Sequence, residues 1–345
     1  MSLYPATDTR FIALTQWLTT LSALQPHYQL KLDSLCLASA DASFRRYFRV
    51  DTQQGESLIV MDAPPPQENV GRFIQVGERL ATAGVSVPAI LAQDIDNGFL
   101  LITDFGHTDY SHALSHDSAH NLYLDAIDAI VLMQSQAPTE GLPEYDRAFF
   151  LREMMLFPQW YIGTHLGVTL TDEQTTILNT AFEAILANTL AQPQVFVHRD
   201  FHSRNLMVLE KGNPGVLDFQ DAVYGPITYD LVSLLRDAYV QWDEEMVLDW
   251  AIRYWERAKR AGLPVNADID AFYRDFEFMG IQRHLKIMGL FARLHHRDGK
   301  DAYLKAMPLV MEYIRRAAKR YIALIPFGRL IDELEGTASQ IGYTF

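Results

Sequence analysis

Two neighbouring stretches of the chain combine acidic and amide side chains in a spacing that could support transfer of a phosphoryl group. The first reads VFVHRDFHSRNLMV (residues 195–208), and the second reads VLDFQDA (residues 216–222). Asp200 follows a predicted strand, Asn205 precedes the next strand, and Asp218 ends a third. Because short loops join these strands, we expect the three side chains to converge on one point.

These side chains suit the separate tasks of phosphoryl transfer. The reaction needs a carboxylate that takes the proton of the attacking hydroxyl, and ligands for a metal that neutralises charge on the phosphates. Carboxylate and amide oxygens are hard ligands that suit Mg²⁺. We therefore predict that Asp200 is the catalytic base and that Asn205 and Asp218 bind Mg²⁺. Such residues in loops often only cap backbone groups, but the whole pattern H-R-D-x-x-x-x-N followed by D-F is that of protein kinases.

The N-terminal part of the chain has the pattern of a small antiparallel sheet. Short runs rich in β-branched and aromatic residues, separated by turn residues, are typical of strands. Five such runs occur, LCLA, RYFRV, LIVM, AILAQ and GFLLIT, and the last two are joined by Asp96-Asn97-Gly98. Apolar residues at helical spacing predict one helix over 8–24 and another over 68–83, after the third strand.

Beyond Asp104 the pattern is mostly helical, and only VFV, LMVLE and GVLDF are predicted strands there. The predicted helices cover residues 117–135, 147–163, 171–191, 228–239, 243–262, 268–293 and 301–325. The boundary between two lobes is expected near 103–107, so that residues 1–104 form an N-lobe and residues 105–345 a C-lobe. The predicted fold class is therefore α+β.

Composition narrows the class of protein. The formal net charge is −14, which argues against nucleic acid or an anionic membrane as the main partner. Cys36 is the single cysteine, so no internal disulfide can form, as is usual in a reducing compartment. The first residues, MSLYPATDTR, do not read as a signal peptide, and no uncharged apolar stretch reaches 18 residues. We expect a cytoplasmic monomer that acts on a small molecule.

The motifs resemble those of the protein-kinase-like fold. Glutamine follows Asp218-Phe219, where protein kinases have glycine, and this is similar to the aminoglycoside and choline kinase branch, whose members phosphorylate small molecules. The stretches that look like the bacterial anomeric amino-sugar kinases of cell-wall recycling are SADASFRRYFRV, LIVMDAPPP, LLITDFG, LDFQDAVYGPITYDLVSLLRDAY and QRHLKIMGLFARL. One departure is His198-Arg199-Asp200, since histidine-glycine-aspartate is usual in that branch.

The resemblance covers nearly the whole chain and carries expectations of fold and activity. It implies a two-lobed fold with a small antiparallel β-sheet N-lobe and a mostly helical C-lobe. It also implies an ATP-dependent and Mg²⁺-dependent kinase. Its substrate would be the anomeric hydroxyl of N-acetylmuramate or N-acetylglucosamine, within peptidoglycan recycling.

The lysine with which protein kinases hold the α- and β-phosphates is missing. Met61 stands at its position, and no lysine occurs from residue 32 to residue 210. Arginine can grip phosphate oxygens through two nitrogens, and SADASFRRYFRV lies where a phosphate-covering loop should be. We favour Arg46 as the replacement, with Arg45 as the alternative, and expect Ser43 in the same nucleotide-binding loop.

Further candidates follow from position. Ile102 and Thr103 end the strand that leads into the lobe boundary, where this fold contacts adenine through backbone groups. The resemblance implies that Asp230 braces the catalytic loop with support from His198, although an acid at a helix start is also favourable by itself. Candidate substrate contacts, all of which could equally be ordinary core or surface residues, are Glu153, Trp160, His202, Arg204 and Arg283. A sugar that bears a carboxylate would need a cation, and the helix around Arg283 supplies several.

Two other functions remain open at this point. A kinase of an aminoglycoside, a choline-like amine or another small alcohol would use the same catalytic residues, with an acidic pocket for a cationic acceptor. A nucleotide-binding pseudokinase scaffold would bind without turnover. The presence of Asp200, Asn205 and Asp218 together argues against the scaffold.

Overall fold

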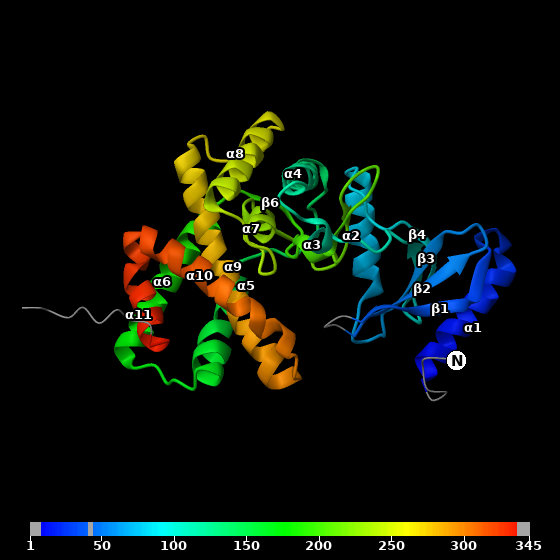
Figure 1. The fold of residues 1–345 in the computed structure, drawn as a ribbon, viewed down its shortest axis with the longest axis horizontal. Coiled ribbons are helices and arrows are strands. Elements are labelled where there is room, and N and C mark those ends of the chain that lie inside the picture. The colour runs from blue at the N-terminus through cyan, green and yellow to red at the C-terminus, as the bar shows by residue number, and fades with distance from the viewer. Residues whose placement is uncertain (1–7, 41–43, 337–345) are drawn as a thin grey trace, which may run out of the picture. The chain divides into compact units, whose positions relative to one another are not determined.

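The computed structural model describes residues 8–40 and 44–336, and the chain divides into two units. The first unit extends to Asp109 and also takes in Leu206–Asp221, while the second contains Tyr110–Asn205 and the chain from Ala222 onward (Figure 1). The catalytic motifs therefore fall in both units: residues 195–205 belong to the second, and Asp218 belongs to the first. The lobe division at residues 104/105 stays a prediction.

The first unit is built on an antiparallel five-stranded sheet with the order β1-β2-β3-β5-β4. Its elements are α1 (Thr9–Leu24), η1 (Pro26–Tyr28), β1 (Leu30–Ala40), β2 (Arg46–Thr52), β3 (Ser57–Asp62), α2 (Val70–Thr82), β4 (Ile90–Asp94), β5 (Phe99–Thr103), β7 (Leu206–Met207) and β8 (Gly215–Val216). The predicted sheet and the helix after its third strand are confirmed. β7 and β8 form a separate two-stranded ladder, much shorter than the predicted runs LMVLE and GVLDF.

Helix α1 covers one face of this sheet. Asp8 caps its N-terminus by accepting a hydrogen bond from the Phe11 N–H (3.0 Å), as serine, threonine and aspartate commonly do. The apolar side chains of α1 pack against those of the strands, and the fully or nearly fully buried members are Leu14, Leu18, Leu21, Leu30, Phe48, Val50, Val60, Phe99 and Leu101. Period-two alternation in the strands and helical periodicity in α1 thus produce one shared core.

The turn between β4 and β5 requires glycine. Gly98 has φ +72°, a left-handed conformation that other residues adopt only at a cost. A Cβ atom at this position would lie 2.0 Å from the Ala63 carbonyl oxygen. The Gly98 carbonyl accepts a hydrogen bond from the Ala63 N–H (2.9 Å), which ties the turn to the end of β3.

The second unit is mostly helical. Its elements are α3 (Tyr110–Ala113), α4 (Ala119–Gln136), α5 (Arg147–Met154), the π-helix η2 (Phe157–His165), α6 (Asp172–Ala191), β6 (Gln194–Val197), η3 (Ser203–Asn205), β9 (Val223–Pro226), α7 (Tyr229–Leu235), α8 (Glu244–Arg260), α9 (Ile269–Asp298), η4 (Asp301–Ala306), α10 (Met307–Arg320), η5 (Ile322–Leu324) and α11 (Ile325–Leu334). A small antiparallel sheet followed by this helical unit confirms the predicted α+β fold class.

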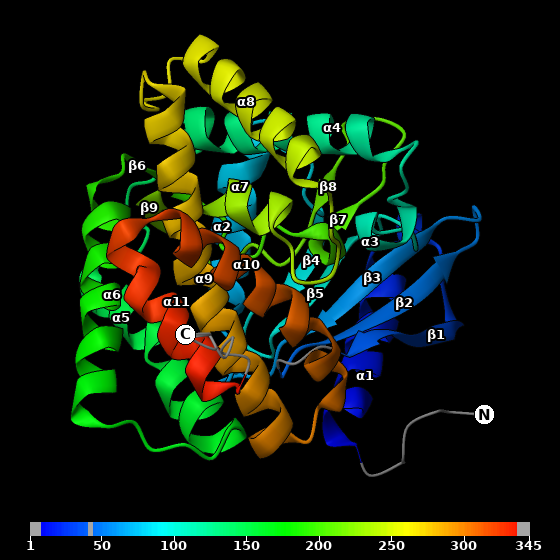
Figure 2. The ribbon, with the colours of Figure 1, turned by 60° about the vertical axis from the view of Figure 1, so that its left-hand side comes forward.

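Helix α9 is the central element of the second unit, where it packs against α5, α6, α7, α10 and η2 (Figure 2). Its 30 residues are mostly buried between Phe272 and Leu294. At Gly289 a Cβ atom would lie 2.3 Å from the Leu156 carbonyl oxygen, so only glycine permits this close approach of α9 to the chain before η2.

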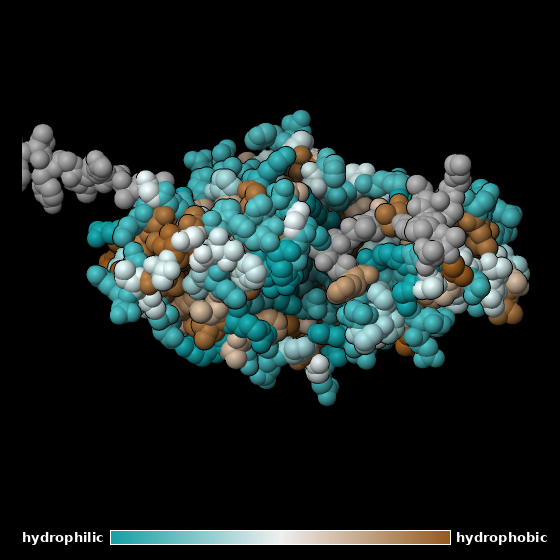
Figure 3. All heavy atoms as spheres, turned by 90° about the horizontal axis from the view of Figure 1, so that it is seen from below, coloured by the Kyte–Doolittle hydropathy of each residue, from teal (hydrophilic) through white to brown (hydrophobic). Residues whose placement is uncertain are grey.

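One face of the molecule is drawn in Figure 3 and is mainly hydrophilic. On the face drawn in Figure 3, apolar side chains are scattered among hydrophilic ones, which agrees with the strongly acidic composition. Among the helices of the described residues, none is long and apolar enough to cross a membrane.

Candidate active site

The catalytic loop of the second unit begins where β6 ends at Val197. The Asp200 side chain is 36% exposed, so it can reach a ligand. Asn205 Nδ2 donates to the Asp200 carbonyl oxygen (2.9 Å), and the loop is closed by the His202 N–H, which donates to the same carbonyl (3.0 Å). Because the Asn205 amide nitrogen is used within the loop, its amide oxygen is the atom that remains to bind a cation.

Two aspartates hold the backbone of this loop. Asp230 accepts hydrogen bonds from the His198 N–H (2.7 Å) and the Arg199 N–H (3.0 Å). Asp237 accepts from the Ser203 N–H (3.0 Å). The imidazole Nδ1 of His198 accepts from the Asp200 N–H (3.2 Å). His198 and Asp230 therefore lie where a supporting role requires them.

Asp237 was not predicted from the sequence, although its spacing from Asp230 indicates a supporting role. Asp230 and Asp237 are seven residues apart, a spacing that returns to the same face of a helix. Asp230 lies within α7 and Asp237 just after it, in LVSLLRDAY. Two acids on one face beside a motif loop indicate two attachment points for that loop.

Two arginines, a lysine and a histidine surround Asp200. Burial raises the pKa of Asp200, but the charges of Lys286, Arg283 and Arg199, together with His202, outweigh this effect and hold the pKa well below its usual range. Arg283 Nη1 lies 3.8 Å from Asp200 Oδ1. Asp200 is therefore ionised at neutral pH, as a group that accepts a proton must be.

Glu153 and Arg283, predicted as substrate contacts, are instead buried among internal partners. Glu153 Oε1 lies 2.7 Å from Arg199 Nη2 and 3.3 Å from Lys286 Nζ, and Oε2 accepts from the Tyr145 hydroxyl. Burial raises the pKa of Glu153, but the charges of Lys286 and Arg199 outweigh this effect, so the pKa lies below its usual value. Side chains that are 7% and 4% exposed leave little surface for a sugar, so we reassign both residues to support of the loop.

The other three substrate candidates are more accessible. Arg204 is exposed and its guanidinium lies 3.6 Å from the centre of the Tyr239 ring. His202 packs edge-on against the same ring. Trp160 is half-buried on η2. The structure thus brings His202 and Arg204 together around Tyr239, and all three stay predictions as substrate contacts.

Asp218, in the first unit, is in contact with Arg45 and not with Arg46. Arg45 Nη2 lies 3.3 Å from Asp218 Oδ1, and Arg45 Nε lies 3.5 Å from Glu68 Oε2. Burial lowers the pKa of Arg45, but surrounding acids, with Tyr47, outweigh this and raise it. The Arg45 guanidinium is therefore a fixed positive charge beside the predicted metal ligand.

The preference for Arg46 is corrected by these contacts. Arg46 bonds the fully buried carboxylate of Asp62 (2.6 Å) and also pairs with Asp8. Asp62 is shared with Arg10 of α1 (2.5 Å). Since β2 begins at Arg46, Arg45 precedes the strand, and neighbouring side chains point to opposite sides. Arg46 serves the contact between α1 and the sheet, and Arg45 becomes the better candidate for phosphate.

The backbone at Asp218 is left-handed, with φ +60°. Phe219 packs on α2, with its ring 4.7 Å from that of Phe73. Asp218 Oδ1 accepts from Arg45 and from Gln220 Nε2 (2.9 Å), which leaves Oδ2 as the oxygen for a cation. A residue held in a sparsely populated conformation by its neighbours is common at functional sites.

The other predicted positions of the nucleotide site lie on β3 and β5 or outside the described residues. Met61, which stands at the position of the missing lysine, is fully buried in β3. Ile102 is buried in β5, and the Thr103 N–H already donates to the Ala89 carbonyl (3.0 Å), so that N–H is not available to adenine. Ser43 lies outside the described residues.

Asn205 of the second unit and Asp218 of the first unit each present an oxygen of the kind that binds a hard cation. Asp218 offers a carboxylate oxygen and Asn205 an amide oxygen, both suited to Mg²⁺. Within residues 8–40 and 44–336, no three His, Cys, Asp or Glu side chains gather closely enough to hold a metal by themselves. A cation at these two residues would therefore need oxygens from a bound nucleotide or water, as Mg²⁺ sites of kinases usually have. The convergence of the two residues stays a prediction.

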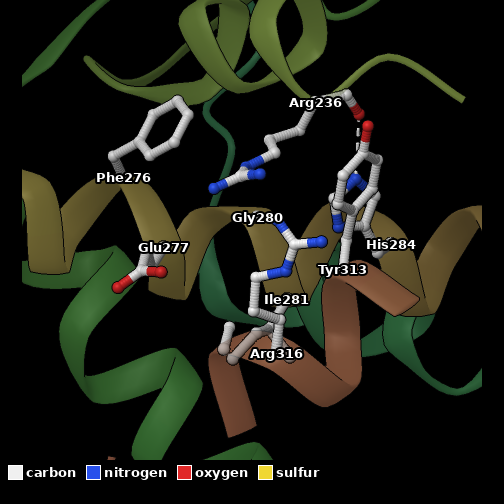
Figure 4. Close-up of a pocket in the computed structure, with 9 residues that line it drawn as sticks. Arg236, Phe276, Glu277, Gly280, Ile281, His284, Tyr313 and Arg316 are labelled. Carbon is white, nitrogen blue, oxygen red and sulfur yellow. Dashed lines mark hydrogen bonds between the residues drawn. The ribbon is translucent and has the colours of Figure 1, made fainter. Parts of the chain in front are cut away.

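A separate small pocket lies in the second unit between α7, α9 and α10 (Figure 4). Its volume is about 10 Å³, which is about the room that one water needs. Arg236 and Arg316 both pair with Glu244, and Arg316 also pairs with Glu312, so two carboxylates balance the two arginines. It does not offer room for a substrate.

Comparison with known proteins shows the family of the chain. Residues 34–263 match the phosphotransferase enzyme family. A protein from Neisseria meningitidis named N-acetylmuramate/N-acetylglucosamine kinase is 47% identical over 341 residues, which cover 97% of this chain and 99% of that protein. Relatives with the same name occur in Pseudomonas putida, at 46% identity over 97% of this chain and 99% of the relative, and in Caulobacter vibrioides, at 28% over 79% and 85%.

Solved structures show the same fold. A choline kinase from Streptococcus pneumoniae superposes with a TM-score of 0.61 at 13% identity, covering 91% of this chain and 99% of that one. An ADP-bound aminoglycoside phosphotransferase gives a TM-score of 0.57 at 17% identity, covering 86% and 97%. The fold is therefore protein-kinase-like, and with the family match and its full-length relatives the chain belongs to the phosphotransferase enzyme family.

Proposed function

We propose that this chain is an ATP-dependent kinase that phosphorylates the anomeric hydroxyl of N-acetylmuramate and N-acetylglucosamine. The observation that carries the proposal is identity of 45–47% to three relatives of that name, over at least 95% of both chains. The product would be a sugar 1-phosphate for peptidoglycan recycling.

The residues of the catalytic loop divide the reaction between them. The ionised Asp200 orients the acceptor hydroxyl and accepts its proton as the oxygen bonds to the γ-phosphorus of ATP and the bond to the β-phosphate oxygen breaks, which releases ADP. Asp230 and Asp237 hold the loop backbone, so that this carboxylate is presented in a fixed direction. Positioning of this kind supplies much of the rate enhancement in phosphoryl transfer.

The nucleotide side rests on Arg45, Asn205 and Asp218. Bound Mg²⁺ would neutralise charge on the β- and γ-phosphates, and the amide of Asn205 with the carboxylate of Asp218 would hold it. Arg45 leaves its contact with Asp218 to bind phosphate oxygens, while Glu68 keeps the guanidinium oriented. A planar guanidinium offers two donors where the usual lysine offers one point charge.

Two further properties are the location of the enzyme in the cell and its oligomeric state. We propose that the enzyme works as a monomer in the cytoplasm, where ATP is available. The single cysteine, Cys36, is free and exposed, which is compatible with a reducing compartment.

The test uses the purified chain with Mg·ATP and a panel of acceptors: N-acetylmuramate, N-acetylglucosamine, an aminoglycoside and choline. Phosphorus NMR of the products identifies the phosphorylated carbon. A 1-phosphate on either amino sugar, absent with the other acceptors, is the expected result. Turnover only of the aminoglycoside or choline would favour the other small-molecule kinases, and nucleotide binding without turnover of any acceptor would favour the scaffold.

A further inference from the structure

Arg199 has a left-handed backbone directly before the proposed catalytic residue. Its φ is +78°, one of three such values found for non-glycine residues in the described part of the chain. A Cβ atom makes this conformation unfavourable, whereas glycine adopts it readily. Since the backbone at Arg199 sets the direction in which Asp200 leaves the loop, another group must hold it.

Both peptide groups that flank the Arg199 Cα atom are held by buried charged side chains. On one side, the Arg199 N–H donates to Asp230 Oδ1 (3.0 Å). On the other side, Arg283 Nη1 donates to the Arg199 carbonyl (2.8 Å). Asp230 is fully buried and Arg283 is 4% exposed. The two bonds fix φ and ψ of one residue from opposite ends.

Arg283 is placed for this task and not for contact with a sugar. The same Nη1 atom lies 3.3 Å from the Tyr229 hydroxyl and 3.8 Å from Asp200 Oδ1. The second distance is too long for a hydrogen bond but short enough for a strong charge interaction. Arg283 therefore acts on the residue before the carboxylate through a hydrogen bond, and on the carboxylate itself through charge.

The Arg199 side chain explains why a residue other than glycine can be kept here. Its guanidinium is anchored on Glu153 (2.7 Å) and lies over the Phe149 ring (5.0 Å). This anchor ties the loop to α5, and the strained backbone then depends on the carbonyl contact.

We propose that Arg283 is a positioning residue for Asp200, which it serves by holding Arg199 in the left-handed conformation that glycine would adopt unaided. The proposal rests on the proposed kinase function. Neither the H-R-D pattern nor the spacing of the motifs indicates this role of Arg283.

The test is a rescue experiment. Arg283→Ala is expected to lower kcat at least about tenfold while the KM values for ATP and sugar change less than twofold. Arg199→Gly in the Arg283→Ala background should raise kcat at least threefold above that of Arg283→Ala alone, because glycine adopts the left-handed conformation without a clamp. Arg199→Ala in the same background removes the same side chain but keeps a Cβ atom, and it should restore nothing. Arg274→Ala, at an exposed position of α9, serves as the neutral control.

The outcomes separate the proposal from its rivals. Equal effects of glycine and alanine at position 199 would overturn it, and a raised KM for sugar with unchanged kcat would make Arg283 a substrate contact. If Arg283→Ala does not fold, as judged by circular dichroism, Arg283→Met carries the same cycle, because methionine keeps most of the side-chain volume but has no donor. Asp200→Asn is measured in parallel: an active Asp200→Asn enzyme defeats the proposed base, whereas an inactive one with no glycine rescue defeats only the clamp.

Discussion

Arg45 and Asp218 are 173 residues apart in the sequence, and their side chains are in contact, with 3.3 Å between Nη2 and Oδ1. The guanidinium is also 3.5 Å from Glu68. In protein kinases a lysine of the third strand pairs with a helix glutamate beside the metal-binding aspartate. Here Arg45, which directly precedes β2, contacts Glu68, which precedes α2, and the predicted metal ligand Asp218.

We expect Arg45→Ala to raise the Kd of Mg·ATP about tenfold or more, since a hydrogen bond to a charged group contributes about 1.5–3 kcal/mol. Arg45→Lys should recover only part of this affinity, because it lacks the planar fork. Isothermal titration calorimetry measures both. A change of less than threefold in Arg45→Ala would mean that phosphate is held by backbone N–H groups or by the second unit.

Arg46→Ala is the matched control and should show the opposite profile. The Kd of Mg·ATP should stay within twofold, because Arg46 is committed to Asp62 and Asp8. The free energy of unfolding should fall by about 1–3 kcal/mol, since a buried carboxylate loses one of its two arginines. Urea denaturation measures this loss, and weaker ATP binding with unchanged stability would restore the original preference for Arg46.

Met61→Lys is expected not to restore phosphate binding in the Arg45→Ala protein. Met61 is fully buried in β3, so a lysine there would have to place an ammonium group in an apolar site, at a cost of at least ~2 kcal/mol of stability. ATP titration and thermal unfolding of the double variant check both statements. Recovery of affinity would show that the strand position is still competent and that Arg45 is not its replacement.

Asp200→Asn should lower kcat by about 10²–10⁴-fold, which is the usual contribution of a positioned general base. The melting temperature should fall somewhat, because the carboxylate that nearby cations stabilise is lost, whereas nucleotide binding should change little. Steady-state kinetics with Mg·ATP and N-acetylmuramate gives kcat. A variant that keeps more than a tenth of the wild-type kcat would exclude Asp200 as the base.

The sequence predicts the strands of the sheet but not which side of β2 lies towards Asp218. The run RYFRV predicted β2 correctly, and the pairing of β2 with β1 and β3 buries every second residue. Alternation puts Arg45 and Arg46 on opposite sides of the chain, but it does not say which side faces a ligand. The ion pairs of Arg45 with Asp218 and of Arg46 with Asp62 decide this, and only the structure shows them.

Local chemistry explains two of the differences between the predicted and the observed elements. Residues 147–163 were predicted as one helix, but α5 ends at Met154 and η2 follows, with Pro158 in its first turn. Proline lacks the N–H that an α-helix needs and clashes with the preceding turn. Strand β9 contains Gly225 and Pro226, which are untypical of strands, and it exists because its backbone pairs with β6.

The partners of buried charges were also beyond sequence reasoning. Glu153 and Arg283 look like exposed polar positions of helices in the sequence. In the fold they meet Arg199 of the loop after β6, Tyr229 of α7 and Lys286, which lies on the same helix as Arg283. Charge compensation across elements distant in sequence leaves no periodic signal, so a substrate role and a supporting role cannot be told apart before the packing is known.

The last prediction concerns acid stability and His284. This imidazole is buried on α9 beside the pocket of Figure 4, with Nε2 donating to the Arg236 carbonyl (3.0 Å). Burial lowers its pKa to about 3, whereas an unfolded histidine titrates near 6.5. Between these values the unfolded chain binds one more proton than the folded chain. This residue's contribution to stability is therefore fully present above about pH 6.5 and is lost progressively as the pH falls towards 3.

We expect His284→Gln to reduce the slope of unfolding free energy against pH between pH 5 and 6.5, because glutamine keeps a donor for the Arg236 carbonyl but does not titrate. The slope that a single such group adds is at most about 1.4 kcal/mol per pH unit. Urea unfolding at several pH values measures it in the wild type, in His284→Gln and in His120→Gln, which changes an exposed histidine of α4. If His284→Gln keeps the wild-type slope, His284 is protonated in the folded protein or another buried group controls acid unfolding.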